Sequence, residues 1–201
     1  MVLRVFTDGA CSNNGKPGAK AGLGVYFGEG DERNTAKRII GRQTNNTAEL
    51  SAIIEVFAIL INEIDNGDEI IIYSDSKVAI GWVTSTGDKY SKKSWTGKIP
   101  NVELIKEGHA LFKSFANVSI EHVRAHTGFT DELSMGNDGA DRMANEAIGV
   151  FTNKHYLQIP FSGKEVGIKY GAKWDHNKKK WYYEGLTTDD NFDTLCHLFP
   201  L

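Results

Sequence analysis

The stretch EIIIYSDS, residues 69–76, carries the strongest indication of fold class in this sequence of 201 residues. Glu69–Ser74 is short and almost continuously apolar, which is typical of a strand that is covered on both faces of a sheet. The strand ends at Asp75, and a helix is expected from Ser76 to about Val83. A buried strand followed by a helix predicts an α/β domain with a carboxylate where the strand ends.

The segments on either side of this strand predict a mixed sheet. Toward the N-terminus, short connections imply three antiparallel strands, at residues 3–8, 22–27 and 37–41. Apolar residues from Leu50 to Ile64 follow helical spacing. Toward the C-terminus follow a helix, a strand and a last helix, at residues 101–116, 118–125 and 138–148. The expected fold is therefore α/β, a mixed five-stranded sheet flanked by helices.

Composition is that of a globular chain, with 40% hydrophobic and 24% charged residues. Cys11 and Cys196 are too few for a disulfide framework and lack metal-ligand spacing, which favours a reducing compartment. The apolar run at the N-terminus is too short for a signal peptide, and no segment is long enough to span a bilayer. We expect a soluble, intracellular monomer in the cytoplasm or nucleus. The absence of Cys-rich motifs and of a phosphate-binding Gly-x-x-x-x-Gly-Lys loop argues against other classes of nucleic-acid enzyme.

A change in composition after Val150 predicts two domains, residues 1–150 and a small α+β module at residues 153–201. The module is expected to contain strands at residues 156–160 and 180–184 and a helix at residues 164–171. The net charge of −3 does not suggest a nucleic-acid partner, but lysines cluster at two places: Lys89, Lys92, Lys93 and Lys98, and Lys173, Lys178, Lys179 and Lys180. Local basic patches can hold a polyanion where acidic groups elsewhere are masked by cations.

Four carboxylates each have an ordinary explanation when taken alone. Asp8 would be a solvent-facing strand residue before a turn, and Glu49 part of a capping box that begins at Asn46. Asp75 would be the N-cap of a helix, and Asp141 an acid that the helix dipole favours in a first turn. The combination favours another interpretation, because the four acids come from four separate elements. Mg²⁺ prefers a few convergent hard oxygen ligands, and two such ions about 3.5–4 Å apart can promote phosphoryl displacement. Sequence spacing permits this convergence but does not prove it.

Local motifs in this order resemble the type 1 ribonuclease H family, especially its eukaryotic and viral members: FTDGACSNNG (6–15), GRQTNNTAEL (41–50), YSDS (73–76), VRAHTG (123–128) and NDGADRMAN (137–145). The resemblance covers residues 1 to about 148 and implies a ribonuclease H-like fold. It implies that Asp8, Glu49, Asp75 and Asp141 bind two Mg²⁺ ions, with Mn²⁺ as a substitute. Asp138 competes for the last place, but it is better explained as an N-cap. His126 matches a mobile histidine that assists proton transfer and product departure.

The resemblance also implies a set of substrate contacts. Arg42, Thr44 and Asn101 match a pocket for a phosphate of the DNA strand. Asn14, Asn45 and Asn46 match residues along the minor groove of the hybrid, although asparagine is also common in plain turns. Lys92, Lys93 and Trp95 lie in a stretch that looks like the family's basic protrusion, and this stretch departs most from the family in length.

The implied activity is that of a metal-dependent endonuclease that hydrolyses the RNA strand of an RNA–DNA hybrid and leaves 5′-phosphate and 3′-hydroxyl ends. Two alternatives remain: a related nuclease such as a junction resolvase or transposase, and a hybrid-binding module without catalysis. The segment YLQIPFSGKEVGIKYGAKWDHNKKKWYY (156–183), with its Gly-Ala-Lys-Trp-Asp…Lys-x-Trp-Tyr pattern, resembles a small domain of bacterial, phage and viral proteins without a settled function. A viral or phage origin is compatible with the sequence. Trp174 and Trp181 beside lysines suit nucleic-acid binding, or they form the small domain's core.

Overall fold

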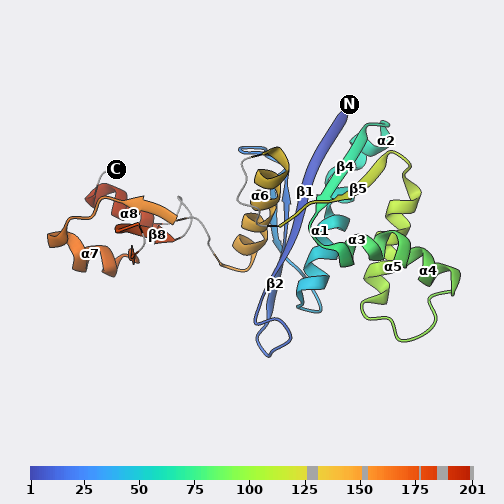
Figure 1. The fold of residues 1–201 in the computed structure, drawn as a ribbon, viewed down its shortest axis with the longest axis horizontal. Helices are drawn as coiled ribbons and strands as arrows, with labels where there is room; N and C mark the ends of the chain where they lie inside the picture. The colour runs from blue at the N-terminus through green and yellow to red at the C-terminus, as the bar shows by residue number, and fades with distance from the viewer. Residues whose placement is uncertain (126–130, 151–153, 177, 185–189, 200–201) are drawn as a thin grey trace. The chain divides into compact units, whose positions relative to one another are not determined.

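A computed structural model describes residues 1–125, 131–150, 154–176, 178–184 and 190–199 (Figure 1). The chain divides into two compact units, Met1–Gly149 and Val150–Leu201. Each unit has its own sheet and its own buried apolar cluster. The two units are therefore described separately.

The first unit contains the mixed five-stranded sheet that the sequence predicts. Its strands are β1 (Val2–Ser12), β2 (Lys20–Tyr26), β3 (Thr35–Arg38), β4 (Glu69–Ser74) and β5 (Val118–His122), in the order β3-β2-β1-β4-β5. The strands β1, β2 and β3 are antiparallel neighbours, whereas β4 runs parallel to both β1 and β5. The parallel strand β4 is therefore internal, in agreement with its nearly continuous apolar sequence.

Helices cover both faces of this sheet. They are α1 (Asn45–Ile59), α2 (Ile61–Asp65), α3 (Lys77–Val83), α4 (Ser85–Lys92), α5 (Val102–Ser114) and α6 (Glu132–Ala147). Figure 1 shows α6 on one side of the sheet and α1, α3 and α5 on the other. The main core lies between the sheet and α1, where Val5, Ile53 and Ile72 are fully buried. A smaller cluster under α6 contains Phe6 and Tyr73, whose rings stack 5.1 Å apart.

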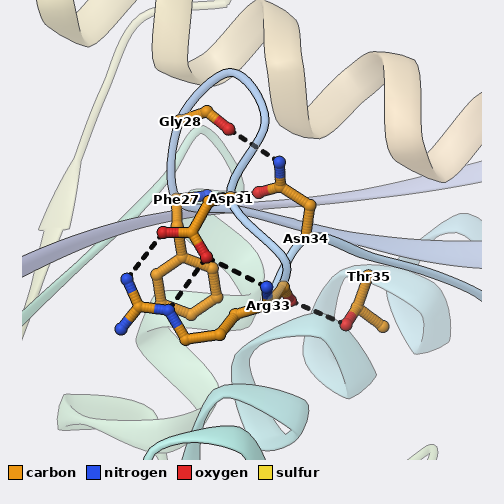
Figure 2. A network of polar contacts seen from close by, with 6 residues as sticks. All are labelled: Phe27, Gly28, Asp31, Arg33, Asn34 and Thr35. Atoms are coloured by element: carbon orange, nitrogen blue, oxygen red, sulfur yellow. Dashed lines mark hydrogen bonds and ion pairs between the residues drawn. The ribbon is translucent and has the colours of Figure 1, made fainter.

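Polar contacts close the hairpin between β2 and β3 (Figure 2). The carboxylate of Asp31 accepts hydrogen bonds from the Arg33 backbone N–H and guanidinium, and that guanidinium lies 4.4 Å from the ring centroid of Phe27. The amide of Asn34 donates to the Gly28 carbonyl at 2.6 Å, and its oxygen accepts from the Phe27 N–H at 2.8 Å. These bonds satisfy backbone groups that lack sheet partners in the turn.

The last helix of this unit begins earlier than the sequence indicates. It starts at Glu132, and Asp131 is its N-cap, accepting a hydrogen bond from the Ser134 N–H at 3.1 Å. The prediction of Asp138 as the N-cap is therefore wrong. The first turns contain residues of low helix propensity, so the sequence does not indicate a helix there. Two of these residues are glycines that close packing requires. A Cβ atom at Gly136 would overlap the ring of Phe6, and one at Gly139 would contact the ring of Tyr26.

Helix α4 was not expected, because Ser85–Lys92 is polar and contains a glycine. The other differences are shifts of element ends by a few residues; for example, β1 continues to Ser12 and β3 begins at Thr35. Within the described residues, no helix is both long enough and apolar enough to cross a membrane.

The second unit contains a three-stranded antiparallel sheet in the order β6-β8-β7. Its elements are β6 (Lys154–Leu157), the 3₁₀ turn η1 (Phe161–Gly163), α7 (Lys164–Lys169), β7 (Lys173–Asp175), β8 (Lys180–Glu184) and α8 (Asp190–Leu198). The sequence indicates β8, α7 and, displaced by two residues, β6, whereas β7 and α8 were not anticipated. A small core contains Leu157, Tyr183 and Leu195.

Candidate active site

Two carboxylates lie side by side because of the parallel register between β1 and β4. The register pairs Thr7 with Ser74, so Asp8 and Asp75 are the next residues along their two chains. Asp8 is buried, with 6% of its surface exposed, and one of its oxygens accepts a hydrogen bond from the Gly9 N–H at 2.7 Å. Asp75 follows the end of β4 and is half-buried. It is not the N-cap of α3, because the hydroxyl of Ser76 accepts from the Ala79 N–H.

Glu49 reaches the same place from α1. The N-cap of this helix is Thr44, which forms a capping box with Thr47. Glu49 therefore lies beyond the first turn and has no capping role, which removes its ordinary explanation. The helix can approach the sheet closely because residue 9 is glycine: a Cβ atom there would overlap the backbone between Ala48 and Glu49.

Asp141 is contributed by α6 from the other face of the sheet. It lies more than two turns from the start of that helix, so the dipole explanation for a first-turn acid does not apply. A second glycine permits the close approach, because a Cβ atom at Gly24 would overlap the carbonyl oxygen of Ala140. Gly24 is the cross-strand neighbour of Asp8, so this contact brings α6 to the level of the other acids.

The four acids line one hollow. One carboxylate oxygen each from Asp8, Glu49 and Asp75 lie within 4.8 Å of one another. A cavity of about 320 Å³ is lined by these three acids together with Gly9, Ala10, Cys11, Asn45, Asp141 and Asn145. The structure thus brings together all four carboxylates that the sequence singled out.

Burial and mutual repulsion disfavour the ionised form of two of these acids. The pKa of Asp8 rises from 3.8 to about 8, first because of burial and then because of the nearby charge of Asp75. The pKa of Glu49 rises from 4.5 to about 9, again because of burial first and then because of the charge of Asp8. A positive charge placed among these acids would stabilise their ionised form.

The donor set suits a hard divalent cation. In addition to the clustered carboxylates, the Oε2 atom of Glu49 is buried and has no hydrogen-bond partner within the described part of the chain. A buried anionic oxygen without a partner is costly, and coordination of a cation would satisfy it. Several convergent carboxylate oxygens with open space beside them are the arrangement that Mg²⁺ or Mn²⁺ prefers.

Asparagine side chains hold three of the acids in position. Nδ2 of Asn45 donates to Oε1 of Glu49 at 3.1 Å, and Nδ2 of Asn145 donates to Oδ1 of Asp141 at 2.8 Å. Nδ2 of Asn137 lies 3.4 Å from Oδ2 of Asp75, and Asn137 is 1% exposed. Sequence reasoning missed Asn137 and Asn145. The spacing of four residues between Asp141 and Asn145, which faces the two side chains together on a helix, was the available signal.

Two of the three predicted phosphate-pocket residues line a second hollow. This cavity of about 300 Å³ is lined by Arg42 and Asn101, among others. Thr44 is not part of this lining: it is the N-cap of α1, and its hydroxyl bonds to that of Thr47, which does line the cavity. Asn101 has a left-handed backbone conformation, with φ of 57°, and immediately precedes α5.

The other predicted contact residues are divided between two regions. Oδ1 of Asn14 accepts from the Asn45 N–H at 3.3 Å, and Asn46 is exposed at the start of α1. Asn45 lines the acidic hollow, and the bond to its backbone brings Asn14 next to it. His126 falls outside the described residues, so its proposed role rests on the sequence motif.

The stretch predicted to form the basic protrusion, which contains Lys92, Lys93 and Trp95, packs against α5. Lys92 and Lys93 are exposed at the end of α4, whereas Trp95 is half-buried and packs edge-on against His109, with ring centroids 5.6 Å apart. Nε2 of His109 lies 3.0 Å from Oδ1 of Asp88, and these contacts tie the segment to α5. Sequence reasoning missed this role of His109.

Comparison with known protein families agrees with this geometry. Residues 2–149, about three quarters of the chain, match the RNase H family. The chain belongs to the ribonuclease H family. Residues 154–194 match a domain of unknown function.

Individual relatives span different parts of the chain. Ribonuclease H1 of Mus musculus is 37% identical over 146 residues, which are 71% of this chain and 48% of the relative. The chain thus spans about half the length of this relative. A probable ribonuclease H of Acanthamoeba polyphaga mimivirus is 34% identical over 197 residues, 90% of this chain and 86% of the relative. Among solved structures, LC9-RNase H1, described as a type 1 RNase H with the type 2 active-site motif, has a TM-score of 0.55 at 25% identity, covering 74% of this chain and 72% of that one.

Proposed function

We propose that this protein is an endoribonuclease that hydrolyses the RNA strand of RNA–DNA hybrids and leaves 5′-phosphate and 3′-hydroxyl ends. The observation that carries the proposal is the convergence of Asp8, Glu49 and Asp75 within 4.8 Å, in one hollow with Asp141. Family membership supports the same activity. A divalent cation is the charge that this site requires, and Mg²⁺ fits its oxygen donors.

Each acid would have a defined part in holding two cations. Asp8 would contact both cations, because it lies within the carboxylate cluster and the charges of Asp75 and Asp141 both raise its pKa. Glu49 would contribute its unpartnered Oε2 atom, and Asn45 would fix the other oxygen. A pair of bound cations supplies an activated water and stabilisation of the leaving oxygen in an in-line displacement. His126 would assist proton transfer and departure of the product.

Substrate choice would depend on the asparagines and on the second hollow. Asn45 lines the acidic hollow and Asn14 bonds to its backbone, and we expect these two amides, with Asn46 next in sequence, to hydrogen-bond the 2′-hydroxyls that distinguish RNA from DNA. Arg42 and Asn101, in the second hollow, would hold a phosphate of the DNA strand. The RNA strand would then lie across the acids.

The deciding experiment compares four labelled substrates: an RNA–DNA hybrid, single-stranded RNA, duplex RNA and duplex DNA. Each is incubated with the full chain in Mg²⁺, in Mn²⁺ and in chelator. We expect cleavage of the RNA strand of the hybrid, dependent on the cation. Cleavage of duplex DNA would instead favour a resolvase or transposase-type nuclease, and binding without cleavage would favour a non-catalytic module.

Two matched substitutions test the site itself. Asp75→Asn keeps the side-chain shape but removes a charge that holds the cations, so we expect it to nearly abolish cleavage. Asp138→Asn is the control, because Asp138 is an exposed acid on α6 outside the acidic hollow. Equal rates for the two folded variants would contradict the assignment.

A further inference from the structure

The second unit has a hollow of its own, unrelated to the carboxylates. A cavity of about 390 Å³ is lined by residues in or next to all three strands of the small sheet, including Tyr156, Gln158, Trp174, Trp181, Lys179 and Lys180. It combines aromatic rings, an amide and two ammonium groups. That combination differs from the main site, whose lining is acidic.

Trp174 and Trp181 have different environments although they face each other across β7 and β8. Their rings meet edge to face, with centroids 5.3 Å apart. Trp181 is half-buried and packs against the small core, whereas Trp174 is 41% exposed. The need for a core therefore explains Trp181. It does not explain why the ring of Trp174, beyond its contact with Trp181, remains open to solvent beside the hollow.

The charges around this hollow favour an anion. Within the described residues, neither Lys179 nor Lys180 forms an ion pair, and the ammonium group of Lys178 lies 4.6 Å from the ring centroid of Tyr156. Asp175 is the nearby acid, and its carboxylate already accepts from the Tyr156 hydroxyl at 2.8 Å and from the Lys178 N–H at 3.0 Å. The lysines thus remain available for an external anion, while the acid is occupied.

We propose that this hollow binds single-stranded nucleic acid, with one base stacked on Trp174 and the flanking phosphates held by Lys179 and Lys180. Aromatic rings beside lysines are the arrangement that binds single strands, because every base has a face to stack and every linkage has a charge. A base paired within a duplex cannot enter such a hollow without leaving its stack. This goes beyond the proposed function: the second unit would bind an unpaired strand, whereas the proposed cleavage of a hybrid belongs to the first unit.

The test uses the full chain in chelator, so that nothing is cleaved. A short fluorescein-labelled oligodeoxythymidylate is titrated and its anisotropy is followed at several salt concentrations. We expect Trp174→Ala to weaken binding about tenfold or more and to leave the salt dependence unchanged, because only stacking is lost. We expect the double variant Lys179→Ala/Lys180→Ala to reduce the slope of log affinity against log salt by about 0.7 for each lost phosphate contact.

Matched controls lie in the same unit. Phe161 is 91% exposed and Lys164 is exposed, and neither lines the hollow. Phe161→Ala and Lys164→Ala should leave both affinity and salt slope unchanged. Trp174→Phe, which keeps a smaller ring, should restore part of the binding, and it also keeps the test valid should Trp174→Ala fail to fold. Wild-type affinity in Trp174→Ala and in the lysine double variant would overturn the proposal, as would equal losses in the two controls.

A second readout separates this proposal from the cleavage activity. With Mg²⁺, a blunt hybrid and the same hybrid carrying a single-stranded extension are compared as substrates. We expect Trp174→Ala to raise KM for the extended substrate while kcat and the blunt substrate are unaffected. Equal effects on both substrates would overturn the single-strand assignment. Absence of cleavage by the wild-type chain would contradict the proposed function, and the binding titration would still decide the role of the hollow.

Discussion

Replacing Asp8 by Asn should stabilise the cation-free protein at neutral and alkaline pH while it abolishes catalysis. Burial and the charge of Asp75 raise the pKa of Asp8 from 3.8 to about 8. At about 1.36 kcal/mol per pKa unit, this rise sets an upper limit of about 6 kcal/mol on the free-energy cost of ionising Asp8 in the folded state. Neighbouring acids share that cost and water screens part of it, so we expect about 1–3 kcal/mol.

Proton linkage determines whether stability rises or falls with pH. Between about pH 4 and pH 8 the Asp8 carboxyl is ionised in the unfolded chain but retains its proton in the folded one. The stability associated with the raised pKa is therefore complete below about pH 4 and is lost as pH rises through about 8. Glu49, whose pKa rises to about 9, acts in the same direction. Without divalent cation, the free energy of unfolding of the wild type should fall between about pH 4 and pH 8. The free energy of unfolding of Asp8→Asn should fall less over the same range.

The assay is urea unfolding followed by circular dichroism, near pH 5 and near pH 8, in chelator and in Mg²⁺. A cation that binds only the folded state stabilises it by mass action, so Mg²⁺ should stabilise the wild type near pH 8 and the variant much less. Asp138→Asn, an exposed acid on the same unit, should behave as the wild type does. A loss of stability in Asp8→Asn near pH 8 in chelator, or equal stabilisation of both proteins by Mg²⁺, would refute the reasoning.

Three further substitutions test other parts of the site. Gly24→Ala should cost about 1–3 kcal/mol in urea unfolding, because its Cβ atom would overlap the Ala140 carbonyl, and wild-type stability would contradict the close packing of α6. Asn145→Ala removes the donor at 2.8 Å from Asp141 and should raise the Mg²⁺ concentration for half-maximal cleavage about tenfold, as measured by cation titration; an unchanged titration would deny it this role. His126→Ala should lower turnover by at most about 10²–10⁴, and a single-turnover rate as low as that of Asp8→Asn would instead mark it as a ligand or structural residue.

The sheet could be predicted because its signals are local. The apolar run of β4 and the turn residues between the first strands depend only on residues that are close in the sequence. They therefore predict where these strands lie and that the first three strands are neighbours in the sheet. Asp75 directly follows the apolar run of β4, whereas its neighbour Asp8 lies inside β1, which continues to Ser12. Helix starts were harder to locate. The cap of α1 is Thr44 rather than the more conspicuous Asn46, because the choice depends on which hydroxyl meets Thr47.

The convergence of Glu49 and Asp141 on Asp8 could not be derived from spacing, because it depends on contacts between elements distant in sequence. Gly9 lets α1 approach one face of β1, and Gly24 lets α6 approach the other face of the sheet. A glycine at either position looks like a strand weakener in the sequence, since nothing local shows which backbone it will meet. The loss of β propensity there is offset by the close helix approach that brings the acids together. The glycines that make the strands look weak are therefore the ones that permit the site to form.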